Sequence, residues 1–196
     1  MATVQLNDHA SQTSFRKSQL IVYPTYGFCR IAAVEQADVR DGLEDCYVFQ
    51  MGSATNPIKV LMPVAQAEKA GLRRPITKQE ADAVLEVFEM AATPLEPRTK
   101  EQLDEVSARL SSNDLLQVAA TIRDLAAAGV KAGDGQSDAA CVNHRRSEQA
   151  MLSQALGRLI EEIAYAQRVP HKQVEGHVRK CLERTRRAHA TPVQER

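Results

Sequence analysis

His177 and Cys181 are the side chains whose types and spacing come closest to a chemical site in this sequence. They are four residues apart, so on a helix the imidazole and the thiol would lie on the same face. Both groups are zinc ligands, but a zinc site needs more protein ligands than two, and only His171 lies nearby in the chain. We therefore expect no metal site here, and instead a solvated helix face with a half-buried thiol.

The other candidates for chemistry do not form a set. Glu161 and Glu162 are neighbours, so on a helix they point in different directions and are expected to lie on a solvated face. The run Gly133-Asp134-Gly135 lacks the lysine and the flanking strand of a phosphate-binding loop. We find no catalytic residues and expect no cofactor. An enzyme of another type would need a polar pocket, for which the sequence offers no candidate.

Composition indicates an ordinary globular protein of one large or two small domains. The 196 residues are 43% apolar, and 25 basic residues balance 25 acidic ones, so no overall field favours nucleic acid. Basic residues outnumber acidic ones over 168–196, by eight to three. There is no signal peptide or membrane-spanning run, and the four cysteines, Cys29, Cys46, Cys141 and Cys181, are far apart. We expect a reduced, cytoplasmic protein whose cysteines are apolar fillers.

Strand signals follow a polar segment, residues 1–14, which we expect to be a mobile leader. Strands are predicted at about 19–24, 28–37, 45–51 and 57–62, with turns at Arg40-Asp41-Gly42 and Asn56-Pro57. Apolar side chains alternate on both faces of 45–51, which suits a strongly curved sheet. Residues 15–74 are therefore predicted to form a small Tudor- or SH3-like β module.

Helix signals take over after residue 75. Thr77-Lys78-Gln79-Glu80 is a capping box, a second helix is expected near Thr99, and Asn113 or Asp114 is expected to cap a third. A flexible loop is predicted at 129–142, followed by a long helix at about 147–167. We predict an all-α domain over 75–168 and a basic C-terminal helix and tail over 169–196, which makes the fold α+β.

Several short motifs, in the same order along the chain, resemble the CarD/CdnL family of bacterial transcription regulators. Val22-Tyr23-Pro24-Thr25-Tyr26-Gly27 is similar to the family's Val-Tyr-Pro-x-His-Gly signature, with Tyr26 in place of histidine. Further similar segments extend the resemblance over 16–167: Val60-Leu61-Met62-Pro63, Leu110-Ser111-Ser112-Asn113-Asp114, Ala119-Ala120-Thr121-Ile122-Arg123-Asp124-Leu125, and the helix from Ser147 to Ala166.

The resemblance implies a non-enzymatic factor with two partners. Its β module would dock on the RNA polymerase β subunit through a strand edge, and its helical domain would touch promoter DNA and so modulate open-complex formation. The expected polymerase contacts are Ala37, Val39, Lys59, Leu61 and Met62. The expected DNA contacts are Arg98, Lys100, Arg109, Arg123, Arg145 and Arg146.

The chain departs from the family pattern at the contacts themselves. It has no tryptophan for the minor-groove wedge, and Ala126-Ala127-Ala128 replaces a run of tryptophan and arginine. Leu61 and Ala37 stand where family members carry arginine, and Leu61 is either a sheet-core residue or an interface residue. We expect weakened or rearranged DNA contact. The alternative is an adaptor that uses the same strand edge for a different protein partner and binds no DNA.

Overall fold

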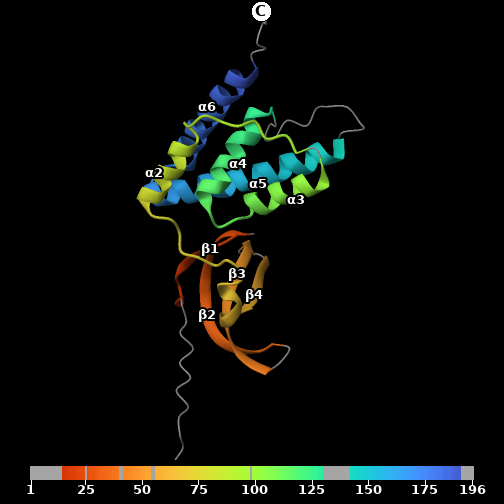
Figure 1. Cartoon of the computed structure of the whole chain (residues 1–196). Coiled ribbons are helices and arrows are strands. Elements are labelled where there is room, and N and C mark those ends of the chain that lie inside the picture. The colour runs from red at the N-terminus through yellow and green to blue at the C-terminus, as the bar shows by residue number, and fades with distance from the viewer. Residues whose placement is uncertain are drawn as a thin grey trace, which may run out of the picture. The chain divides into compact units, whose positions relative to one another are not determined.

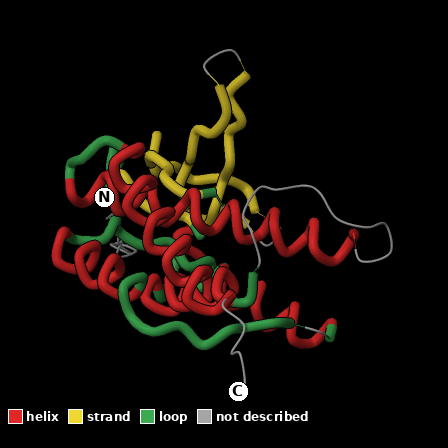
Figure 2. The backbone as a smooth tube through the Cα atoms, turned by 90° about the horizontal axis from the view of Figure 1, so that it is seen from above, coloured by secondary structure: helices red, strands yellow, loops and turns green. Residues whose placement is uncertain are grey.

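The structure, a computed structural model, describes residues 15–24, 26–39, 42–53, 56–97, 99–129 and 142–190, without the side chains of 50–58, 142–148 and 190. The expected leader, two of the three residues of the Arg40-Asp41-Gly42 turn, most of the 129–142 loop and the end of the basic tail lie outside these residues. The chain divides into two compact units, Met1–Pro75 and Ile76–Arg196. Strands belong to the first and most of the helical residues to the second, which confirms the α+β prediction (Figures 1 and 2).

The first unit, called the β unit below, is a four-stranded antiparallel sheet in the order β1-β2-β3-β4. The strands are β1 (Leu20–Tyr23), β2 (Gly27–Val39), β3 (Gly42–Ser53) and β4 (Asn56–Pro63). β2 and β3 run past their predicted limits because their ladder continues to the pair Val39 and Gly42. The predicted strands stopped at the turn signal Arg40-Asp41-Gly42 and its acidic neighbours, whereas the hydrogen-bonded ladder continues up to it.

The chain after β4 closes one edge of this sheet. Helix α1 (Val64–Ala67) follows Pro63 directly, and Gly71 then takes a left-handed φ of 77° that turns the chain back. Arg73 reaches β1, where the backbones of Val22 and Arg73 exchange hydrogen bonds of 2.8 and 3.1 Å. β1 is therefore paired on both sides, whereas β4, among the described strands, is paired only with β3.

One face of the sheet packs into a core with α1. Tyr47 is its largest fully buried side chain, and its hydroxyl oxygen accepts a hydrogen bond of 3.1 Å from the backbone N–H of Phe15. The remaining buried members of this core are Phe15, Ile21, Cys29, Ile31, Phe49, Ala67 and Leu72. An irregularity in the β2–β3 register between Ile31 and Ala33 adds to the bending of β2 that Figure 1 shows.

In the second unit, called the helical unit below, the described residues form five helices. They are α2 (Lys78–Val87), α3 (Lys100–Leu110), α4 (Leu115–Ala127), α5 (Val142–Gln167) and α6 (His171–Ala190). Capping boxes at Thr77 and Thr99 start α2 and α3, and the Asp114 side chain accepts from the N–H groups of Leu116 and Gln117 to start α4. These three helix starts are where the sequence predicted them, because each depends on local side-chain to backbone bonding.

Helix α4 lies at the centre of the helical unit and packs against α2, α3, α5 and α6. Helix α6 contributes Val174, Val178, Cys181 and Leu182 to the shared core. Among the described residues, no helix has both the length and the apolar character that crossing a membrane would require.

One sequence expectation about this core is wrong. Glu162 is buried at 4% exposure, and its carboxylate accepts a hydrogen bond of 3.1 Å from the backbone N–H of Ile76. Only Glu161 of the pair lies on the solvated face. A buried carboxylate is tolerated here because it satisfies a backbone donor at the beginning of the unit.

Candidate partner-binding surface

The sheet has a second face, which we call the outer face, on the side opposite the β-unit core. Cross-strand pairing places Ala33, Val48 and Leu61 in one row and Glu35, Cys46 and Pro63 in the next. Because side chains alternate along a strand, four of the expected polymerase contacts share this face: Ala37, Val39, Lys59 and Leu61. Met62 is on the opposite face, where it packs against the core.

An ion pair crosses the outer face. Lys59 Nζ on β4 lies 2.5 Å from Glu35 Oε1 on β2, and both side chains are largely exposed. In the strand register, Lys59 lies opposite Gln50 and Glu35 lies opposite Cys46. The ion pair therefore crosses β3 diagonally, at the level of Val48, which is buried.

Leu61, unlike Val48, is exposed. Its side chain is 45% exposed, which settles the two sequence alternatives against a place in the sheet core. It is next to a strand edge that has no partner among the described residues. An exposed leucine beside a free edge combines backbone hydrogen-bonding capacity with an apolar anchor, as binding by strand addition requires.

Cys46 lies in this face but offers no reactive thiolate. Burial raises the pKa of the Cys46 thiol, and the carboxylates of Glu44, Asp45 and Glu35 raise it further. A neutral thiol is a poor nucleophile. Among the outer-face side chains that the structure describes, Cys46 therefore offers no activated nucleophile.

Of the expected DNA contacts, Lys100 and Arg109, whose side chains the structure describes, lie on the same helix but do not share a face. Lys100 is exposed at the start of α3, whereas Arg109, in its last turn, pairs with Glu105 at 2.6 Å. Nine residues of helix separate Lys100 from Arg109, so they lie on opposite sides of α3. Arg98 lies outside the described residues, and so do the side chains of Arg145 and Arg146 in the first turns of α5.

Arg123, another expected DNA contact, is buried and bonded within the helical unit. It is only 8% exposed, pairs with Asp124 at 2.8 Å and donates a hydrogen bond of 3.1 Å to the carbonyl of Val87 at the end of α2. Asp124 in turn accepts from the N–H of Thr93 through its side chain and from the N–H of Leu95 through its carbonyl. The pair therefore holds the end of α2 and the segment after it against α4.

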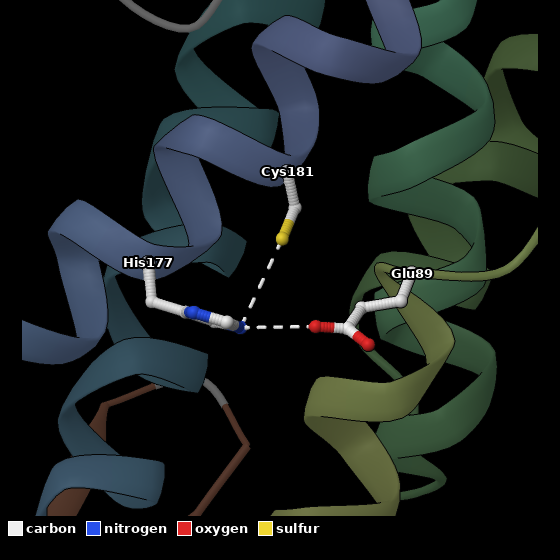
Figure 3. A group of neighbouring side chains, drawn as sticks. All are labelled: Glu89, His177 and Cys181. Atoms are coloured by element: carbon white, nitrogen blue, oxygen red, sulfur yellow. Dashed lines mark hydrogen bonds and ion pairs between the residues drawn. The ribbon is translucent and has the colours of Figure 1, made fainter.

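A third group of polar side chains gathers where α6 meets the end of α2 (Figure 3). His177 Nε2 lies 3.7 Å from Glu89 Oε1 and 3.8 Å from Cys181 Sγ. Sequence reasoning considered His171 as the further ligand, but His171 lies 3.7 Å from Glu175, its neighbour one helical turn along. It missed Glu89, because nothing in the local sequence indicates that the end of α2 comes beside α6.

Comparison with protein families gives two matches, one for each unit. Residues 15–76 match the model of the CarD-like/TRCF RID domain. Residues 83–179 match the model of the CarD C-terminal domain. The two matches follow one another along the chain and together cover most of the described residues.

Proposed function

This chain belongs to the CarD-like family of RNA-polymerase-interacting regulators, and on that basis we propose that its β unit binds the β subunit of bacterial RNA polymerase. The contact would be made by the edge of β4 together with the outer face, centred on Leu61. The adaptor function with another partner is the alternative outcome of the experiments below.

The observation that carries this proposal is the exposed Leu61 beside an edge strand within the family-matched domain. A strand of the partner added to β4 would pair its backbone groups with the outward N–H and C=O groups of β4. Leu61 would be the apolar anchor of such an interface, and the Lys59–Glu35 pair would form its polar margin.

Regulation by such a protein requires no reaction. A factor that binds a polymerase–promoter complex more tightly after the DNA has melted shifts the equilibrium towards the open state by the difference in its two affinities. The β unit would supply attachment to the polymerase. The helical unit would supply whatever contact distinguishes melted from closed promoter DNA.

We propose that this DNA contact is weak and limited to the start of α3. The family's tryptophan is absent, Arg123 is buried, and Arg109 already pairs with Glu105. Lys100 is the one expected contact that the structure describes as exposed and for which it gives no ion pair. A single lysine supplies a phosphate contact without sequence selectivity.

A salt series with labelled promoter DNA tests the contribution of Lys100. We expect the slope of log affinity against log salt to be shallow, and Lys100→Ala to reduce its magnitude by about one unit. Lys78→Ala is the matched control, because Lys78 is also exposed and, like Lys100, directly follows the threonine that caps its helix. Fluorescence anisotropy measures both. If wild-type binding is absent, the DNA part of the proposal is removed, and equal slopes for the two variants would exclude the start of α3.

Affinity capture tests the polymerase part. The tagged full chain should retain the β subunit from a native bacterial lysate, and a chain with Leu61→Asp should not. Failure of the wild-type chain to retain the β subunit, together with recovery by a Leu61→Arg variant that restores the family residue, would show that this protein has changed its partner.

A further inference from the structure

Glu89, His177 and Cys181 bring three different metal-binding groups to one point. One ligand atom from each lies within 4.8 Å of the other two: a carboxylate oxygen, an imidazole nitrogen and a thiol sulfur. We propose that this cluster is a binding site for a divalent transition-metal ion of the Zn²⁺ type, with three protein ligands and a fourth position open to water.

The separation of His177 and Glu89 is longer than a direct hydrogen bond, whereas His177 and Cys181 lie within the range of a weak sulfur hydrogen bond. A nitrogen–oxygen hydrogen bond is about 2.7–3.2 Å long, and His177 Nε2 lies 3.7 Å from Glu89 Oε1. Tetrahedral zinc with usual bond lengths places neighbouring N, O and S ligands about 3.4–3.6 Å apart. The 3.7 and 3.8 Å separations from His177 would need only a small contraction around an ion, and the Glu89 oxygen and the Cys181 sulfur, which lie within 4.8 Å of each other, would also have to reach about 3.6 Å.

The backbone already holds the three residues in position. His177 and Cys181 are one turn apart on α6, and Cys181 is anchored in the core beside Val178 and Leu182. Glu89 follows Phe88, which is 1% exposed, and its N–H donates to the carbonyl of Glu86 at 2.9 Å. The exposed side chains of Glu89 and His177 would have to adjust on binding.

The ligand set selects the class of ion. Thiolate and imidazole favour zinc and its neighbours over magnesium and calcium, which prefer sites made of oxygen atoms. Three protein ligands at the surface leave a position for water, unlike a closed structural site with four. A bound ion would join the end of α2 to α6 and so stabilise the helical unit.

Arg184 opposes the ion and gives the proposal a distinctive test. Its guanidinium lies 3.9 Å from Cys181 Sγ, so a positive charge faces the position that a metal cation would occupy. Arg184 is exposed and can swing towards solvent. Arg184→Ala should therefore bind the metal several-fold more tightly than the wild-type chain, although it adds no ligand.

Cobalt titration of the metal-free full chain tests the site. We expect a thiolate-to-cobalt charge-transfer band that Cys181→Ser abolishes and that Glu89→Gln shifts to at least tenfold higher cobalt concentration. His171→Gln, on the same helix, and Cys29→Ala, in the β unit, should leave the band unchanged. The absence of a band, its persistence in Cys181→Ser, or unaltered affinity in Glu89→Gln would each overturn the proposal.

A thermal measurement checks that the ion acts on the helical unit. Zn²⁺ at about a hundred times its Kd should raise the Tm of the helical unit by about 5–10 °C. His177→Gln changes an exposed residue and should keep the metal-free Tm while losing this shift. An equal Zn²⁺-induced shift in His177→Gln would place the bound ion elsewhere.

Discussion

Replacing Leu61 with aspartate is expected to weaken binding to bacterial RNA polymerase by about 100-fold. Leu61 is exposed on the outer face beside the free edge of β4, where a docked strand would bury it. Burying a carboxylate without a partner costs a few kcal/mol, and about 2.7 kcal/mol corresponds to this loss of affinity. The Kd for purified core polymerase, measured by biolayer interferometry, gives the comparison.

Leu116→Asp is the matched control for that substitution. Leu116 is also a leucine and is 47% exposed against 45% for Leu61, but it lies at the start of α4 in the helical unit. Both variants should remain folded, because neither side chain is buried and an acidic residue is favourable in the first turn of a helix. Wild-type affinity in Leu61→Asp, or an equal loss in Leu116→Asp, would contradict the assignment of the interface to β4.

The second large effect concerns stability. Arg123→Ala is expected to lower the free energy of unfolding of the helical unit by about 3 kcal/mol and its Tm by about 10 °C. The substitution leaves the carbonyl of Val87 without this donor and the carboxylate of Asp124 without its ion pair. Unpaired buried groups are expensive, so the cost exceeds that of losing a surface contact. Thermal unfolding followed by circular dichroism measures the change.

Arg109→Ala controls for the loss of an arginine. Its ion pair with Glu105 is a solvent-exposed pair within one helix and should contribute no more than about 0.5 kcal/mol. Arg123→Ala should thus be much less stable than Arg109→Ala. A Tm near that of the wild type, combined with a shallower salt dependence of DNA binding, would instead return Arg123 to a DNA surface.

Local sequence signals predicted where most elements begin. The capping boxes at Thr77 and Thr99 and the Asp114 cap depend on residues within one turn of each other, so they can be read from neighbours in the sequence. The start of α5 was harder, since the helix begins at Val142 and a glycine-rich stretch that carries no capping signal precedes it.

Burial on several sides of α4 could not be predicted from an amphipathic pattern. The apolar stripe of Val118, Ile122 and Leu125 identifies one buried face, but four other helices surround α4. Ala126 and Ala127 are consequently buried as well, where small side chains allow close packing. Arg123 looks solvent-facing on a helical wheel and is enclosed only because α2 ends beside it.

The positions of the candidate binding residues also depend on contacts between distant parts of the chain, which the sequence does not reveal. The position of Leu61 depends on cross-strand pairing, and because both faces of β3 are apolar, the sequence left its exposure open. Glu89 joins His177 and Cys181 across a long chain separation, which no local spacing rule can reveal. The types of the binding residues could be read from the sequence, but their convergence could not.

Hydrogen–deuterium exchange of the full chain, with and without bacterial core RNA polymerase, tests the central claim most directly. If the polymerase adds a strand to β4, amides of Asn56–Pro63 that are open to solvent in the free protein should exchange more slowly in the complex. The exchange rates of the α6 amides should be unchanged, because α6 belongs to the helical unit, to which we assign no polymerase contact. Unchanged exchange throughout β4, or protection confined to the helical unit, would contradict a polymerase interface at this edge.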